Sequence, residues 1–129
     1  MADESPQVLV IDDSELALEG MIETLHAGMI PAIGMPSAIG STRIVLRYKI
    51  RVVVVDVNMP IVTGTNLVAL FRNNSKLAGV KIVLVSGLPR AELVKMASEC
   101  GADDVVAKDE VEDTLVSTVR RLLPKATQI

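Results

Sequence analysis

The sequence predicts an α/β fold in which helices cover both faces of a doubly wound, five-stranded parallel sheet. Short apolar runs alternate five times with segments whose apolar residues recur at helical spacing. The connections are short, and the chain has no linker, repeat or low-complexity stretch. Three of the apolar runs, VLVI, VVVV and IVLV, are continuous rather than alternating, which is typical of parallel strands buried on both faces.

The first strand and helix are predicted at residues 7–12 and 16–25. The strand is a short apolar run, QVLVID, that ends in an acidic residue. In the helix, apolar residues recur at spacings of three and four, while glutamates occupy another face. Gly28 follows where this helix is expected to stop.

The second strand is predicted at residues 29–34, where the apolar pattern is less regular. Pro31 lacks the backbone N–H that a central strand needs, so this strand is expected at an edge of the sheet. A short helix is expected at residues 37–47, although Gly40 lies within it.

The third strand, at residues 50–55, contains four consecutive valines and is followed directly by Asp56. An unpaired charge at the end of a buried run is costly, so a neutralising partner is expected beside this carboxylate. The next helix is predicted at residues 65–73, with Thr65 as its capping residue after Gly64.

Two further strand–helix pairs complete the pattern. The fourth strand is predicted at residues 80–86 and its helix at residues 90–100, which Gly101 ends. The fifth strand is predicted at residues 103–108, and an apolar stripe places the last helix at residues 111–123.

Together these elements predict a flavodoxin-like (βα)5 arrangement. Right-handed crossovers join the parallel strands, and the usual order for five such units is 2-1-3-4-5. The chain has 129 residues, which is the size of one ordinary domain. We therefore expect a single domain over residues 1–129, with its core at about residues 7–123.

Polar side chains end four of the five strands. Asp12 and Asp13 follow the first strand, and Asp56 follows the third. Ser86 ends the fourth strand and Lys108 ends the fifth. Ligands of open parallel sheets bind beyond the carboxyl ends of the strands, and the first and third strands are neighbours in this order. We therefore expect these side chains to meet at one edge.

Three carboxylates in one cleft repel each other unless a cation lies among them. Oxygen ligands without histidine or cysteine favour Mg²⁺ (or Mn²⁺) over zinc. Such an ion attracts an anion, most naturally a phosphate, for which Lys108 supplies a positive charge and Ser86 a hydroxyl donor. One carboxylate can also be the nucleophile, and Asp56 is the best candidate because it stands alone on its strand.

These residues resemble the receiver domain of two-component response regulators, from residue 7 to about residue 123. Each shared feature is weak alone, but their order and spacing together are highly specific. The shared features are the Asp12–Asp13 pair, the segment DVNMP from Asp56 onward, Gly64, Ser86 followed by the small Gly87, and Lys108.

The resemblance implies a phosphoacceptor switch in signal transduction rather than an enzyme with a separate substrate. It implies that Asp56 takes a phosphoryl group from a histidine kinase or a phosphotransfer protein. It also implies that Ser86 and Lys108 contact the phosphoryl oxygens. Phosphorylation then changes the face formed by the fourth helix, fifth strand and fifth helix, through which a downstream protein binds.

A metal site follows from the same resemblance. It implies that Mg²⁺ (or Mn²⁺) is bound by Asp13, Asp56 and the backbone carbonyl of Asn58. Asp12 is expected to act on the ion through a water molecule.

Two positions depart from the pattern of such domains. They usually carry Tyr or Phe three positions before the lysine, and this ring turns inward when the hydroxyl residue moves toward the phosphate. Here that position holds Val105. They usually have proline after the lysine, joined by a cis bond, whereas Asp109 follows Lys108 here. The cis form costs about 3 kcal/mol before a non-proline residue, so we expect a trans bond with a rearranged fifth loop, or a strained bond.

Other functions compete with the phosphoacceptor switch. A degenerate receiver would keep the fold and act as a phosphorylation-independent protein-interaction module. A phosphohydrolase with an aspartyl intermediate would need a further acid and a cap domain, for which a chain of 129 residues has no room. The sequence contains no P-loop motif and no glycine-rich dinucleotide motif, which disfavours a nucleotide site.

Composition argues against several partners. The net charge of −3 and the aromatic content of 2% disfavour nucleic acid, and no apolar run reaches the ~18 residues that a membrane helix needs. The N-terminus lacks a signal-peptide pattern, so a cytoplasmic protein is expected. A basic group around the second helix is either a solvated face or a docking patch for a partner. It consists of Arg43, Arg47, Lys49 and Arg51.

Overall fold

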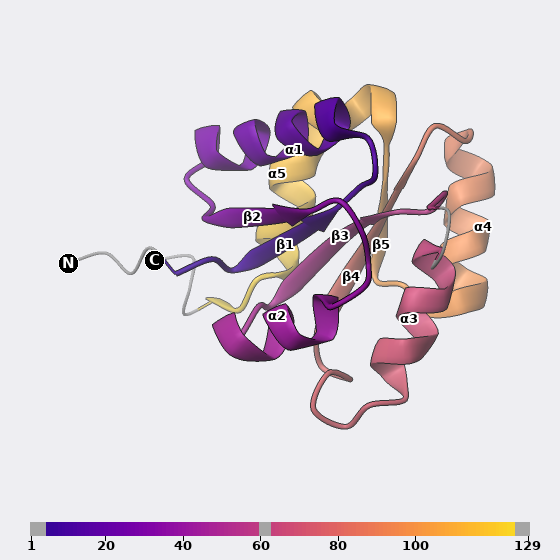
Figure 1. Cartoon of the computed structure of the whole chain (residues 1–129). Coiled ribbons are helices and arrows are strands. Elements are labelled where there is room, and N and C mark those ends of the chain that lie inside the picture. Colours follow the sequence, from indigo (N-terminus) through magenta and orange to yellow (C-terminus); the bar gives the residue numbers. More distant parts are fainter. Residues whose placement is uncertain (1–4, 60–62, 126–129) are drawn as a thin grey trace.

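A computed structural model describes residues 5–59 and 63–125 of the chain (Figure 1). Its strands are all parallel and form one sheet in the order β2-β1-β3-β4-β5, which confirms the predicted fold class and strand order. The strands are β1 (Val8–Ile11), β2 (Ala32–Met35), β3 (Val52–Asp56), β4 (Lys81–Ser86) and β5 (Asp104–Ala107). The helices are α1 (Glu15–Ala27), α2 (Ser41–Tyr48), α3 (Gly64–Arg72), α4 (Arg90–Cys100) and α5 (Val111–Leu122), with the 3-10 turn η1 (Lys108–Glu110) before α5.

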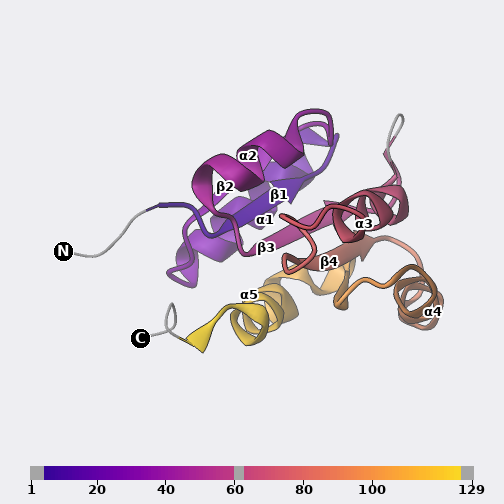
Figure 2. The same cartoon turned by 90° about the horizontal axis from the view of Figure 1, so that it is seen from below.

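The helices form two layers, one on each face of the sheet. Figure 2 shows α2 and α3 on the opposite side of the sheet from α5. Alternate strand residues belong to two separate apolar cores: Leu9 and Val53 pack with α2, α3 and α4, whereas Val8 and Val52 pack with α1 and α5. Successive side chains of a strand point to opposite faces, so each central strand must be apolar at every position. The valine-rich runs are continuous because their successive side chains pack into the two cores in turn.

The edge position of β2 confirms the prediction drawn from Pro31. The predicted bounds of 29–34 were wrong: the strand begins at Ala32, directly after Pro31, so the missing N–H does not interrupt its ladder. Pro31 contributes its carbonyl, which accepts hydrogen bonds from the N–H groups of Gln7 at 3.0 Å and Val8 at 3.3 Å.

The second helix is shorter than predicted. Gly40, which was expected inside it, precedes it with a φ of 84°, in the left-handed region that only glycine adopts freely. The prediction of a start at residue 37 was therefore wrong, and α2 begins at Ser41.

The start of α3 packs closely against the end of β3. The capping residue is Thr63 rather than the predicted Thr65, and its Oγ1 accepts a hydrogen bond from the N–H of Asn66 at 3.2 Å. A Cβ atom on Gly64 would lie 2.9 Å from the carbonyl oxygen of Asp56. Glycine therefore lets α3 begin immediately beside Asp56.

The peptide bond between Lys108 and Asp109 is trans, which is the first of the two alternatives expected for the loop after β5. The described residues contain no cis peptide bond. The chain instead forms the turn η1, which leads directly into α5. Arg90 Nη1, at the start of α4, lies 3.6 Å from Glu110 Oε2, so an ion pair connects this turn to α4.

Within the described ranges, no helix combines the length and the apolar content that crossing a membrane requires.

Candidate functional site

The strand registers bring the polar residues to the carboxyl edge of the sheet. Ile11 of β1 pairs with Val55 of β3, so the residues that follow them are neighbours. One carboxylate oxygen from each of Asp12, Asp13 and Asp56 lies within 4.8 Å of the others. The structure thus brings together the three acids that the sequence predicted to meet.

Asp12 is the most deeply buried of the three, with no exposed surface. Its Oδ1 accepts a hydrogen bond from the N–H of Ser14 at 2.9 Å. Its Oδ2 has no hydrogen-bond partner and lies 3.5 Å from Lys108 Nζ. A buried carboxylate oxygen without a hydrogen bond is destabilising, which indicates that a further positive group belongs beside it.

Ser14 has two roles that the sequence reasoning missed. Its Oγ caps α1 by accepting a hydrogen bond from the N–H of Ala17 at 3.3 Å. Its own N–H orients Asp12. A serine between an acidic pair and an amphipathic helix is a common capping signal and could have been found from the sequence.

Asp56 ends β3 as the last residue of the strand and is 4% exposed. Its Oδ1 accepts a hydrogen bond from the N–H of Asn58 at 3.3 Å, and its Oδ2 lies 3.8 Å from Lys108 Nζ. Burial raises the pKa of Asp56 above its usual value of 3.8, and the charges of Asp12 and Asp13 add to this. Lys108 and the Asn58 hydrogen bond lower that pKa but do not cancel the rise.

Asp13 differs from the other two acids because its residue is exposed. It therefore opens the cluster toward solvent, while Asp12 and Asp56 form its buried side. Asn58, whose backbone carbonyl is the expected metal ligand, is exposed on the same loop that begins at Asp56.

The donor set fits a hard divalent cation. All three side chains offer carboxylate oxygens. The buried Asp12 Oδ2 has no hydrogen bond, and the opening at Asp13 leaves room for water ligands. Mg²⁺ is bound in proteins by one or two carboxylates and several waters, so this cluster is of the right kind.

Ser86 ends β4, the strand next to β3, and Lys108 directly follows β5, the strand beyond β4. Ser86, the last residue of β4, is 1% exposed, and its Oγ accepts a hydrogen bond from the N–H of Leu88 at 3.1 Å. It pairs in register with Ala107, the residue before Lys108. The Lys108 ammonium lies within 4 Å of both Asp12 and Asp56, at distances longer than a charge-assisted hydrogen bond.

The two unusual positions lie on either side of this lysine. Val105 is 3% exposed and packs in the core under α2, α3 and α4. Asp109 is exposed in the turn η1. The valine fills its place as a core residue, and no large side chain at this position can move between an outer and an inner orientation.

Residues 8–120 match the family model of the response regulator receiver domain. A curated relative, the transcriptional regulatory protein MctR of Rhizobium johnstonii, is 28% identical over 88% of this chain and 53% of its own length. The transcriptional regulatory protein PrrA of Mycobacterium tuberculosis is 27% identical over 92% of this chain and 50% of its own length. The chain thus spans about half the length of these relatives.

Two solved structures share the fold along almost their whole length. A response regulator receiver protein from Pseudomonas putida is 28% identical, with a TM-score of 0.76 over 94% of this chain and 99% of that one. The chemotaxis protein CheY4 of Vibrio cholerae has a TM-score of 0.81 over 92% of this chain and 98% of its own, and at 24% identity it shows the fold alone.

Proposed function

The chain belongs to the response regulator receiver domain family, and we propose that Asp56 is its phosphoacceptor. The family works in two-component signalling, in which receivers interact with histidine kinases or phosphotransfer proteins and with downstream effectors. For this chain, the proposal is that a phosphohistidine of such a protein is the donor. The matched residues also support the proposal that residues 1–129 act as a single receiver domain.

The observation that carries the proposal is the imbalance of charge around Asp56. One oxygen from each of three carboxylates lies within 4.8 Å of the others, and the Lys108 ammonium lies within 4 Å of two of them, Asp12 and Asp56. The pKa of Asp56 is raised by its burial and by Asp12, so the charged form is disfavoured in the protein alone. Binding of a divalent cation would stabilise this carboxylate cluster, and the bound cation would then attract an anionic group such as a phosphoryl group.

The ion is proposed to be Mg²⁺ or Mn²⁺. Asp13, Asp56 and the backbone carbonyl of Asn58 would hold it, with Asp12 acting through water. When bound, the ion neutralises charge that develops on the phosphoryl oxygens during transfer.

Phosphoryl transfer requires a carboxylate nucleophile at a fixed place. An oxygen of Asp56 attacks the phosphorus, the phosphorus–nitrogen bond of the donor breaks, and the electron pair leaves on the imidazole nitrogen, which takes up a proton from water. The Asn58 N–H, 3.3 Å from Oδ1, orients the carboxylate for this attack.

Lys108 and Ser86 are proposed to bind the transferred group. The Lys108 ammonium lies between Asp12 and Asp56 with no short hydrogen bond to either, so it can turn to a phosphoryl oxygen at small cost. Ser86 Oγ accepts from Leu88 N–H, which leaves its own hydrogen free to donate to another phosphoryl oxygen.

The downstream protein is proposed to bind the face formed by α4, β5 and α5. Because Val105 is a core residue, the signal cannot depend on a turning aromatic ring. The ion pair between Arg90 and Glu110 connects α4 to the turn that follows Lys108, and it is the proposed route by which a movement of Lys108 reaches this face.

The test is exposure of the purified protein to acetyl phosphate with and without Mg²⁺, followed by intact-mass measurement. We expect a gain of one phosphoryl group that requires Mg²⁺ and is absent in Asp56→Asn. No gain in the wild-type protein, or an equal gain in Asp56→Asn, would contradict the proposal. The phosphorylation-independent interaction module is not favoured, because every residue of the phosphoacceptor set is present.

A further inference from the structure

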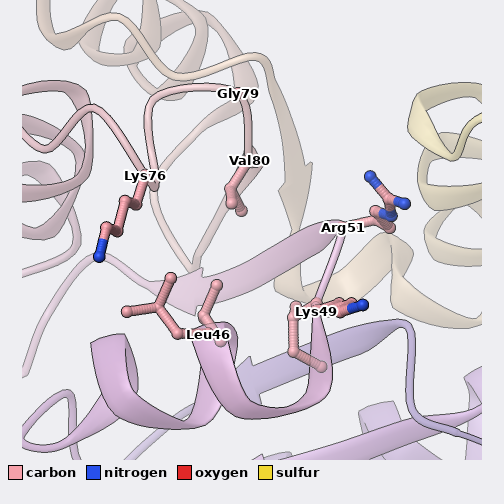
Figure 3. Close-up of a pocket in the computed structure, with 8 residues that line it drawn as sticks. Leu46, Lys49, Arg51, Lys76, Gly79 and Val80 are labelled. Carbon is pink, nitrogen blue, oxygen red and sulfur yellow. The ribbon is translucent and has the colours of Figure 1, made fainter.

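A basic hollow lies at the amino end of the sheet, at the opposite end from Asp56. Its volume is about 310 Å³, and it is enclosed by the last turn of α2, the residue before β3, and the loop between α3 and β4. Figure 3 shows the residues that line it. The labelled ones are Leu46, Lys49, Arg51, Lys76, Gly79 and Val80.

The backbone on both sides keeps this basic hollow open. On the α2 side, Lys49 has a left-handed conformation, with a φ of 56°, which turns the chain from the helix to the buried Ile50. On the other side, Leu77 is fully buried. Its N–H donates to the carbonyl of Asn74 and its carbonyl accepts from the N–H of Val80, so the loop is held in two successive turns. A Cβ atom on Gly79 would meet nothing within 4 Å, so the space is not filled from the loop.

Three cationic side chains border the basic hollow. Within the described ranges, the side chains of Lys49, Arg51 and Lys76 make no ion pair or hydrogen bond, and no acidic residue lines the hollow. Arg47, on the same helix, instead lies over the ring of Tyr48 at 5.3 Å. In a chain with a net charge of −3, this is a local concentration of unneutralised positive charge.

The cations do not converge on one point. In Figure 3, Lys76 lies on one side of the hollow and Lys49 and Arg51 lie on the other, with Leu46 and Val80 between them. Leu46 is 46% exposed although it is a large apolar residue. The charged ends of Lys76 and Arg51 point away from each other in Figure 3, which suits an extended chain with acidic ends and an apolar centre better than a single small anion.

We propose that the basic hollow binds an extended acidic segment of a partner protein, with one aliphatic side chain against Leu46 and carboxylates beside Arg51 and Lys76. The hollow has the size of a small ligand site and combines an apolar floor with charged margins. Because it lies at the other end of the sheet from Asp56, binding there is independent of phosphorylation and is additional to the proposed function.

The test uses a labelled peptide, capped at both ends, with a central leucine between two pairs of glutamates. Binding is followed by fluorescence anisotropy, and the site is mapped from amide chemical shifts of the full chain. Three further probes are the same peptide with serine for leucine, the same peptide with lysines for glutamates, and inorganic phosphate.

The matched variants remove two positive charges each from exposed positions. Arg51→Ala with Lys76→Ala alters the basic hollow, and Lys95→Ala with Lys125→Ala is the control elsewhere on the surface. We expect affinity for the leucine peptide to fall about tenfold in the first pair and by less than about twofold in the control. Leu46→Ser should weaken binding of the leucine peptide and leave the serine peptide unchanged.

Shifted amides should cluster at residues 45–51 and 76–80, and prior phosphorylation with acetyl phosphate should not change the affinity. Equal weakening in both charge variants would show non-specific attraction and overturn the proposal. So would shifts that map to the Asp56 edge, or the absence of binding at millimolar peptide. Equal binding of the serine peptide, or competition by phosphate alone at the same concentration, would identify a simple anion site and overturn it as well.

Discussion

Each end of the sheet carries a group of charged side chains. At the amino end, Arg72 Nη2 lies 2.6 Å from Asp103 Oδ2. At the carboxyl end, Lys108 Nζ lies 3.5 Å from Asp12 Oδ2 and 3.8 Å from Asp56 Oδ2. Both groups join cations and carboxylates from distant parts of the chain. They differ in how completely their hydrogen bonds are made.

The Arg72 group is complete in itself. Asp103 Oδ2 accepts from Arg72 and also from the N–H of Ile82 at 2.7 Å. The guanidinium donates in addition to the carbonyls of Ala78 at 3.1 Å and Val80 at 2.7 Å. This arrangement ties the end of α3 to the starts of β4 and β5, and nothing further is needed to satisfy it.

The Lys108 group is incomplete in itself. Two of the three carboxylates, Asp12 and Asp56, share the Lys108 ammonium at distances too long for strong hydrogen bonds, and Asp12 Oδ2 has no hydrogen bond at all. The comparison teaches how to separate charged groups that stabilise a fold from those that await a ligand. The first kind satisfies its own donors and acceptors, and the second kind leaves buried ones unsatisfied.

The largest expected difference between the two ends is in phosphorylation. Asp56→Asn should abolish the gain of a phosphoryl group from acetyl phosphate, because the nucleophilic oxygen is lost. Asp103→Asn should retain labelling within about twofold of the wild-type rate, since it alters only the structural end. Intact-mass measurement over time checks both, and labelling that survives in Asp56→Asn would remove the distinction.

Stability should show the reverse order. Arg72→Met should lower the free energy of unfolding by about 2–4 kcal/mol, because the carboxylate of Asp103 and the carbonyl of Val80 lose their charged donor. Lys108→Met should cost less than about 1 kcal/mol, since its contacts are long and its side chain is 37% exposed. Urea denaturation followed by circular dichroism measures both, and an equal loss in the two variants would argue against the comparison.

The backbone that carries Asp56 packs closely against the start of α3. Gly64→Ala should cost about 1–3 kcal/mol, because the new methyl group would lie 2.9 Å from the carbonyl oxygen of Asp56. Gly20→Ala is the matched control: nothing lies within 4 Å of its added Cβ, and alanine in a helix should gain about 0.5–1 kcal/mol. If Gly64→Ala proves as stable as Gly20→Ala, the close approach of α3 to β3 is not a constraint.

A smaller effect should appear in the pH dependence of stability without divalent ions. The pKa of Asp56 is raised in the folded chain, so the folded state holds a proton that the unfolded state has released. Stability therefore falls as the pH rises from the usual carboxyl value of 3.8 to the raised one, and the penalty remains at neutral pH. Asp56→Asn should thus be more stable than wild type at pH 7, and the gain should vanish below pH 3.8.

Urea midpoints across pH measure this effect, with Asp103→Asn as the control. That variant should be less stable than wild type at pH 7, because it loses a charged hydrogen-bond acceptor that is already satisfied. A loss of stability in both variants at pH 7 would mean that Asp56 is not strained by its surroundings.

The sequence predicted the parts of the fold that follow from periodicity. The alternation of elements, the edge position of β2 and the meeting of Asp12 with Asp56 all depend on apolar patterns and on parallel register. The positions of Gly40 and Thr63 were missed, because a boundary is decided by single φ values and hydrogen bonds that a pattern of several residues does not resolve.

Groups of distant residues that neither belong to a motif nor end neighbouring strands could not be predicted. Arg72 and Asp103 are 31 positions apart, and neither belongs to a motif. Lys76 joins Lys49 and Arg51 at the basic hollow because of the path of the loop after α3. Such groups exist only once the tertiary structure is formed, so single-sequence reasoning has no signal for them.

The most direct test of the central claim is the effect of Mg²⁺ on the unfolding midpoint of matched variants. In the wild-type protein, Mg²⁺ at ten times its dissociation constant should add about 1.4 kcal/mol of stability. Arg72→Met should unfold more easily yet keep the full increment, whereas Asp13→Asn should lose most of it. An increment that disappears in Arg72→Met and persists in Asp13→Asn, or that is absent from the wild-type protein, would contradict the account.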